Sequence, residues 1–221
     1  VAYAESKGIQ VLNTPSASTR AVAELTIGYL FALARRIPQM TASMREGKWE
    51  KKKFLGMELY GKTLGVIGTG RIGQSVAEKA AGLGMKVLGF DPYVTEAPHI
   101  EFVSLEELLA GSDFITLHIP HNDETHHIID TGALESMKDG VRLVNCGRGG
   151  IIDEAALFQA LKDGKVAGAA LDVFAQEPPE GTQLFTLDEV IGSPHVGAGT
   201  SEAKARVGEV AAQKVIGALK E

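Results

Sequence analysis

Cysteine is almost absent from the sequence, since Cys146 stands alone among 221 residues. A single cysteine excludes an internal disulfide framework and is typical of proteins from a reducing compartment, so we expect a cytoplasmic location. Long apolar runs are also missing. The densest, residues 25–34, is flanked by charged residues and is too short to span a bilayer. Glu5 and Lys7 interrupt the first residues, unlike the apolar core of a signal peptide.

The sequence has no excess of positive charge. Its 22 Lys and Arg against 28 Asp and Glu give a net charge of -6, which disfavours non-specific binding to nucleic acid or to an anionic membrane. A local basic pocket for a small anion is compatible with this charge. The composition is 44% hydrophobic and 23% charged, as in an ordinary globular protein with one main core. We therefore expect a small-molecule partner, and neither nucleic acid nor a membrane.

From residue 62 onward, short apolar runs alternate with amphipathic segments. Strands are predicted at Thr63–Ile67, Lys86–Phe90, Phe114–His118, Arg142–Asn145, Val166–Asp172 and Glu189–Gly192. Helices are predicted at Ile72–Leu83, Leu105–Ala110, Thr131–Met137 and Glu154–Lys162. Unbroken apolar strands are typical of parallel strands covered on both faces. The alternation predicts an α/β fold with a doubly wound parallel sheet.

A long helix is predicted on either side of this alternating region. The first, Thr19–Ile37, has apolar residues on nearly every face, and we expect Pro38 to stop it. A helix of that kind is buried on most sides, between domains or between subunits. The second, Ser201–Lys220, is amphipathic.

A glycine-rich loop, Gly-Thr-Gly-Arg-Ile-Gly, follows the first strand of the sheet and opens a helix. Glycine permits the tight turn, the close approach of a pyrophosphate and the contact between helix and strand. The free N–H groups of the helix start then favour phosphate. Asp91, 18 residues after the loop, matches the acid that accepts ribose hydroxyls and disfavours NADP relative to NAD. The predicted cofactor-binding residues of the loop are Gly68, Gly70, Arg71, Ile72 and Gly73, although Arg71 is equally compatible with a solvated charge.

Three chargeable residues follow the last three predicted strands: Arg148, Glu177 and His195. Ligands of such sheets bind beyond the carboxyl ends of the strands, where these side chains can meet. A histidine can exchange the hydroxyl proton during hydride transfer, and a neighbouring carboxylate favours its charged form. An arginine can hold a substrate carboxylate. Taken singly, each residue is also compatible with a turn, a solvated charge or a loop cap.

The motifs GTGRIG, NCGRGGIIDE, GAALDVFxxEPP and SPHVGA, in this order, resemble the D-2-hydroxyacid dehydrogenase family along essentially the whole chain. The resemblance implies a Rossmann-type NAD-binding domain with Arg148, Glu177 and His195 as catalytic residues. It assigns the nicotinamide-amide contact to Asp172 and the adenine-ribose contact to Asp91. Further cofactor contacts are expected at His118, Pro120, Thr125, Cys146, Gly147 and Gly197.

Some histidines and the cysteine have simpler interpretations. His118 either lines the cofactor channel or makes a backbone hydrogen bond. His121, His126 and His127 lack the spacing of metal ligands and are interpreted as a solvated loop, so no metal is expected. Cys146 is interpreted as a small buried residue and not as a nucleophile.

Within the family, residues 42–54 resemble the phosphoglycerate dehydrogenase branch, which implies oxidation of 3-phosphoglycerate in serine biosynthesis. Family members usually begin with a larger substrate-domain segment, and this chain begins at Val1. We expect residues 1–15 to be a remnant of that domain, 16–196 the NAD-binding domain with its linking helix, and 197–221 a helix returning to the substrate domain. The isolated chain should then be weakly active or inactive, and a homodimer through the NAD-binding domain is expected.

Two alternatives remain open. A non-catalytic NAD-sensing module, similar to the corepressors of the same family, shares these motifs. A glyoxylate or hydroxypyruvate reductase keeps the mechanism and changes only the pocket. The basic segment around Trp49 and the lack of an extended interaction tail favour an enzyme.

Overall fold

The apolar strands form the centre of the molecule. A computed structural model describes residues 1–220 and contains one seven-stranded sheet in the order β3-β2-β1-β4-β5-β6-β7, with every pair parallel. The strands are β1 Thr63–Ile67, β2 Lys86–Phe90, β3 Glu101–Phe102, β4 Phe114–Leu117, β5 Val141–Asn145, β6 Val166–Leu171 and β7 Val190–Gly192. This confirms the predicted doubly wound sheet. The strand order reverses at β1, so the loops after β1 and β4 border the crevice where such folds bind ligands.

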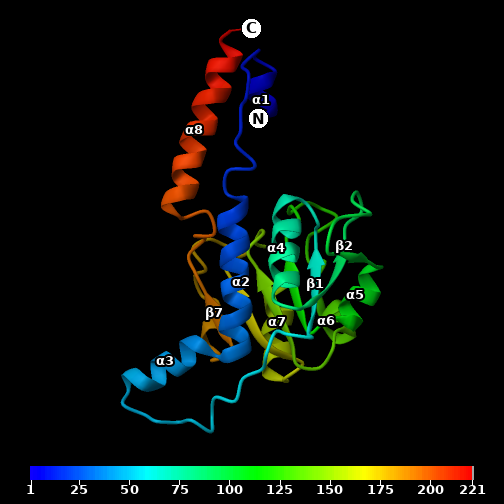
Figure 1. Cartoon of the computed structure of the whole chain (residues 1–221), viewed down its shortest axis with the longest axis vertical. Helices are drawn as coiled ribbons and strands as arrows, with labels where there is room; N and C mark the ends of the chain where they lie inside the picture. The colour runs from blue at the N-terminus through cyan, green and yellow to red at the C-terminus, as the bar shows by residue number, and fades with distance from the viewer. Residues whose placement is uncertain (221) are drawn as a thin grey trace.

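Helices cover both faces of the sheet (Figure 1). They are α1 Ala2–Glu5, α2 Thr19–Arg35, α3 Ile37–Arg45, α4 Arg71–Gly82, α5 Leu105–Gly111, α6 Thr131–Ser136, α7 Glu154–Lys162 and α8 Ser201–Ala218, with a 3-10 turn η1 at Leu184–Thr186. Successive strand side chains point to opposite faces. Val66 accordingly belongs to the core cluster with α2 and α4, and its neighbour Ile67 to the cluster with α5, α6 and α7. Both faces of the sheet are therefore covered by helices, and ligands can reach the sheet only at the ends of its strands.

The predicted end of the first long helix was wrong. Helix α2 ends at Arg35, because Arg36 adopts a left-handed conformation with φ 52° and ψ 43°. Pro38 does not stop it and lies in the first turn of α3. Proline is tolerated there, since the N–H it lacks would have no partner inside the helix.

The apolar surface of α2 is covered largely by its own chain. Ala23 and Leu30 are fully buried in the cluster with α4 and the sheet, whereas Phe31 is 39% exposed. Much of the apolar character of this helix thus reflects packing within the chain.

The two ends of the chain lie side by side, away from the sheet (Figure 1). Lys214 Nζ donates to the carbonyl of Asn13 at 2.7 Å, and Arg206 Nε donates to that of Ala17 at 3.0 Å. In α8 only Ala203 is buried, while Val210 and Ala211 of its apolar stripe are half-buried and Val207 and Val215 are exposed.

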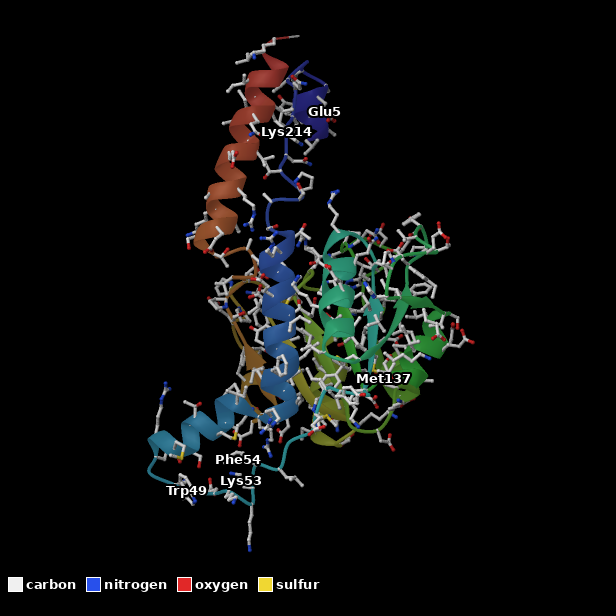
Figure 2. All side chains as sticks on the ribbon, in the orientation of Figure 1. Glu5, Trp49, Lys53, Phe54, Met137 and Lys214 are labelled. Carbon is white, nitrogen blue, oxygen red and sulfur yellow. The ribbon has the colours of Figure 1, made fainter. Side chains whose placement is uncertain are left out.

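At the opposite end of the molecule, an arm of residues 46–55 follows α3, and its Trp49 is 81% exposed (Figure 2). A cavity of about 450 Å³ lies between α3, this arm and the β7 edge. Within residues 1–220, none of the helices combines the length and apolarity needed to cross a bilayer.

Candidate functional site

The glycine loop after β1 has a shape that only glycine allows at two positions. Gly68 has φ +90°, and a Cβ there would lie 2.7 Å from the carbonyl of His118. A Cβ on Gly73 would lie 2.1 Å from the carbonyl oxygen of Gly68, so the first turn of α4 could not rest on the loop. Gly70 differs, because a Cβ there would meet nothing within 4 Å. The loop thus has a tight inner side and an open side at Gly70, next to the N-terminus of α4.

Asp91, at the end of β2, lies against this loop. Its Oδ2 accepts a hydrogen bond from the Thr69 N–H at 2.8 Å, and its Oδ1 accepts from the N–H groups of Tyr93 and Val94. The carboxylate is therefore held at the crevice by the backbone. Arg71 is exposed in the first turn of α4. These residues fit a dinucleotide, because a free helix start, an open glycine and a held carboxylate are the groups that pyrophosphate and ribose require.

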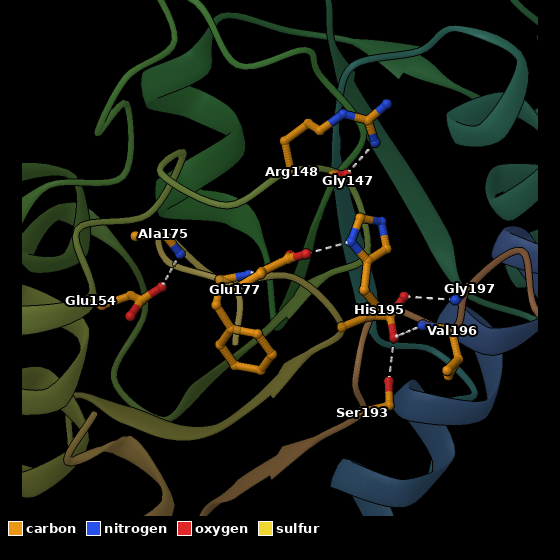
Figure 3. Close-up of polar contacts among 11 residues, drawn as sticks. Gly147, Arg148, Glu154, Ala175, Glu177, Ser193, His195, Val196 and Gly197 are labelled. Atoms are coloured by element: carbon orange, nitrogen blue, oxygen red, sulfur yellow. Dashed lines mark hydrogen bonds and ion pairs between the residues drawn. The ribbon is translucent and has the colours of Figure 1, made fainter. Parts of the chain in front are cut away.

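His195 and Glu177 come together at the carboxyl edge of the sheet. His195 Nδ1 lies 2.7 Å from Glu177 Oε2 (Figure 3). The side chains are 52% and 38% exposed, so a ligand can reach them. An ionised carboxylate only accepts hydrogen bonds, and Nδ1 must therefore carry the proton, which leaves Nε2 for another partner. The hydrogen bond from His195 is the main cause that lowers the pKa of Glu177.

Arg148 lies near this pair, and its guanidinium group points toward the side of His195 in Figure 3. Its positive charge also contributes to the lowered pKa of Glu177. Arg148 Nη1 donates to the carbonyl of Gly147 at 2.7 Å, and no carboxylate within residues 1–220 forms an ion pair with Arg148. The structure thus brings together the three residues that the sequence predicted as catalytic. Their roles stay a prediction.

A hollow of about 230 Å³ lies beside the histidine and the glutamate. It is lined by Phe174, Glu177, Pro178, Pro179, Pro194 and His195. The Glu177–Pro178 peptide bond is cis. Glu177 Oε1 accepts from the Phe174 N–H at 3.2 Å, and Glu154 Oε1 accepts from the Ala175 N–H at 2.7 Å. The segment that carries Glu177 is therefore fixed by two carboxylates.

Asn145 was missed as a site residue although it ends a buried strand. It is 2% exposed, its Nδ2 donates to the carbonyl of Arg148 at 2.9 Å, and its Oδ1 accepts from the Gly147 N–H at 3.0 Å. It shapes the turn that presents Arg148. A polar residue at the last position of an apolar strand was the available signal, because a buried amide needs such partners.

Asp172 is almost completely buried, at 1% exposure. Its carboxylate accepts hydrogen bonds from the Val196 N–H at 2.8 Å, from the Gly197 N–H at 2.7 Å and from the Ser193 hydroxyl. These contacts hold the segment that carries His195. The predicted contact of Asp172 with the nicotinamide amide stays a prediction.

The hydrogen bond proposed for His118 goes to a side chain and not to the backbone. Nε2 lies 3.0 Å from the Thr116 hydroxyl, while Nδ1 is buried without a partner among residues 1–220. Burial lowers the pKa of His118 to about 4, so the ring is neutral near pH 7. Because Nδ1 of His118 is buried beside the glycine loop without a partner, it is available for a hydrogen bond with a bound ligand.

The other predicted contacts have local roles. Thr125 Oγ1 donates to the carbonyl of Pro120 at 2.7 Å and holds that loop. Cys146 is buried, which raises its pKa to about 12, so it stays a thiol at neutral pH and is no nucleophile. His121 Nε2 and His126 Nδ1 lie 3.0 Å apart on an exposed loop, and no group of three potential metal ligands occurs in the described part of the chain.

Comparison with known proteins identifies relatives over nearly the whole chain. The family described as "D-isomer specific 2-hydroxyacid dehydrogenase, NAD binding domain" matches residues 27–197. A D-3-phosphoglycerate dehydrogenase of Methanocaldococcus jannaschii is 52% identical over 97% of the chain, which spans 42% of that protein. A hydroxypyruvate reductase of Thermotoga maritima is 50% identical over 97% of the chain, which spans 72% of it.

Solved structures share the fold. A D-lactate dehydrogenase of Aquifex aeolicus, complexed with NAD and lactic acid, has a TM-score of 0.89 and 35% identity. The match covers 99% of this chain and 72% of that one.

Proposed function

The chain belongs to the D-isomer specific 2-hydroxyacid dehydrogenases, as their NAD-binding domain, and on that premise we propose that it serves the oxidation of a D-2-hydroxy acid with His195 as the acid–base group. The observation that carries this proposal is the 2.7 Å contact between His195 and Glu177 at the carboxyl edge of the sheet. NAD, when bound, supplies the acceptor for the hydride.

The residues of the chain then have distinct tasks. His195 takes the hydroxyl proton during oxidation and returns it during reduction, through the Nε2 that its contact with Glu177 leaves free. Glu177 fixes the tautomer and the orientation of the imidazole through its contact with Nδ1. Arg148 holds the substrate carboxylate with its guanidinium group and polarises the 2-oxygen.

Cofactor binding uses the glycine loop. Gly70 leaves space for the pyrophosphate at the start of α4, Arg71 is free to approach it, and Asp91 accepts the ribose hydroxyls. The negative charge of Asp91 repels a 2′-phosphate, which favours NAD over NADP. His118 and Gly147 border the same crevice.

Two substrates are favoured by relatives of this chain. We propose 3-phosphoglycerate first, because residues 42–54 around Trp49 resemble the phosphoglycerate dehydrogenase branch of the family. In addition, the phosphoglycerate dehydrogenase of M. jannaschii is 52% identical. Hydroxypyruvate is the second candidate, since the hydroxypyruvate reductase of T. maritima is 50% identical and the chain spans a larger share of it, 72%. The oxidised form of the first, 3-phosphohydroxypyruvate, differs from hydroxypyruvate only by a phosphate, so a comparison of kcat/KM for the reduction of these two oxo acids distinguishes the candidates.

The chain spans less than half of the phosphoglycerate dehydrogenases it matches. We propose that residues 1–15 and 197–221 belong to a substrate domain and 16–196 to the NAD-binding domain. Supporting this, the family match ends at residue 197, and α1 and α8 stand apart from the sheet. Weak activity of the isolated chain, a homodimer through this domain and a cytoplasmic location stay predictions.

Replacing Gly70 with alanine tests cofactor binding in the 221-residue chain. The new Cβ meets no protein atom within 4 Å, so folding should be unaffected, whereas it would occupy space that the pyrophosphate needs. We expect the dissociation constant of NADH, measured by fluorescence titration, to rise about tenfold or more.

Gly82→Ala is the matched control. Gly82 lies at the other end of α4, and a Cβ there also meets nothing within 4 Å. NADH affinity should match that of the unmodified chain. Equal NADH affinity in the Gly70 and Gly82 variants would contradict the assignment of the loop, and tighter binding of NADPH than of NADH would contradict the role of Asp91.

A further inference from the structure

The segment that carries His195 is an irregular turn outside the regular elements. His195 itself has φ +51°, a left-handed conformation that side chains other than glycine rarely adopt. The turn is held by Asp172, whose carboxylate accepts the N–H groups of the two following residues, Val196 and Gly197. A Cβ on Gly197 would lie 2.9 Å from Asp172 Oδ2, so the contact is tight. The position of the imidazole thus depends on where Asp172 is held.

A chain of hydroxyl groups connects Asp172 to helix α2. The Ser193 hydroxyl contacts Asp172 Oδ1, and the Tyr29 hydroxyl lies 2.5 Å from Ser193 Oγ. An ionised carboxylate only accepts, so Ser193 donates its single proton to Asp172. Tyr29 must then be the donor to Ser193. Burial raises the pKa of Tyr29, which keeps this proton in place at neutral pH.

Helix α2 is a rigid support for this chain. Tyr29 is 9% exposed, and Leu30 and Leu33 beside it are buried against the sheet and α4. Cys146, two residues before Arg148, packs in the same buried cluster as these residues of α2. The same face of α2 therefore contacts the segments that carry His195 and Arg148, which come from different strands.

We propose that Tyr29 is a positioning residue, which acts through Ser193 and Asp172 to hold the turn of His195 so that the imidazole stays within hydrogen-bonding distance of Glu177. This inference rests on the proposed function for its consequence in catalysis. A merely structural tyrosine would fill space in the core and would not influence the imidazole. The phenyl ring provides the packing, so removing the hydroxyl alone separates these two roles.

Tyr29→Phe in the 221-residue chain is the first test. Amide hydrogen exchange at Val196 and Gly197 should accelerate about tenfold, because the acceptor that protects them loses its support. The proton NMR signal of His195 Nδ1–H, bonded to Glu177, should shift upfield or broaden. NADH affinity should stay within about twofold, since the glycine loop is not involved.

The matched control is Ser112→Ala, which removes another buried hydroxyl, at the residue that follows α5, where it donates to the carbonyl of Leu108. It should leave the exchange at Val196 and the His195 signal unchanged. If Tyr29→Phe does not fold, Ser193→Ala interrupts the same chain at its next member and should give the same two changes. Unchanged exchange and an unchanged imidazole signal in a folded variant would overturn the proposal.

A kinetic test separates this inference from the proposed function. In the protein with its complete substrate domain, Tyr29→Phe should lower kcat about tenfold with the KM of NADH unchanged, as expected when an acid–base group is slightly misplaced. If the unmodified protein reduces no 2-oxo acid, the proposed function fails, while the exchange experiment still decides on Tyr29. If the unmodified protein is active and the variant equals it in kcat, the positioning role fails alone.

Discussion

His195→Asn should lower kcat by about 10²–10⁴-fold in the protein with its complete substrate domain, which is the range for loss of an acid–base group. Asparagine tolerates the left-handed backbone of this position, so the turn should persist. Its amide cannot exchange a proton near neutral pH, although it can still contact Glu177. The measurement is steady-state reduction of 3-phosphohydroxypyruvate and of hydroxypyruvate with NADH.

His99→Asn is the control for this variant. His99 is also left-handed, with φ 67°, and is exposed on a loop after β2. Its replacement should leave kcat within about twofold, as for most surface changes. An active His195→Asn enzyme would remove the acid–base role from this histidine. A parallel loss of NADH affinity would instead indicate that the turn had collapsed.

Arg148→Lys should lower kcat/KM for the 2-oxo acid by about 10²–10³-fold, although the charge is kept. The planar fork of arginine can hold both oxygens of a carboxylate, whereas the lysine ammonium is a single point charge. The effect should appear both as a higher KM for the oxo acid and as a lower kcat. NADH affinity should change little, which fluorescence titration checks in the same variant.

Arg45→Lys is the matched change on the surface, at the exposed end of α3. We expect kcat/KM for the 2-oxo acid and the affinity for NADH to stay unchanged in this variant. If lysine replaced Arg148 without loss, a positive charge alone would be sufficient there, and the two-point recognition of the substrate carboxylate would be wrong.

The sheet and its phosphate loop could be predicted from the sequence because their signals are local. Strands such as Thr63–Ile67 are unbroken apolar runs, and the glycines of the following loop occur at the spacing that the turn requires. The convergence of Arg148, Glu177 and His195 followed from a rule of topology, since the carboxyl ends of parallel strands share one edge. Strand β3 was missed because two residues carry no periodicity.

The contacts that hold the site residues in place could not be predicted in the same way. Tyr29 and Ser193 are 164 residues apart, and nothing in the sequence near either one indicates their contact. The end of α2 was misjudged because it depends on the backbone of Arg36, and the proline that follows is acceptable in the first turn of a helix. Local sequence thus indicates which groups do the chemistry, while the contacts that hold them depend on the tertiary fold.

We propose that the nicotinamide of bound NAD lies beside the imidazole of His195. Isotope-filtered NOE spectroscopy of the labelled chain saturated with NADH tests it directly. We predict cross-peaks between the nicotinamide ring protons and the imidazole protons of His195. Bound NADH with nicotinamide cross-peaks only to the distant cavity beneath α3, at Phe54 or Phe185, would contradict the account.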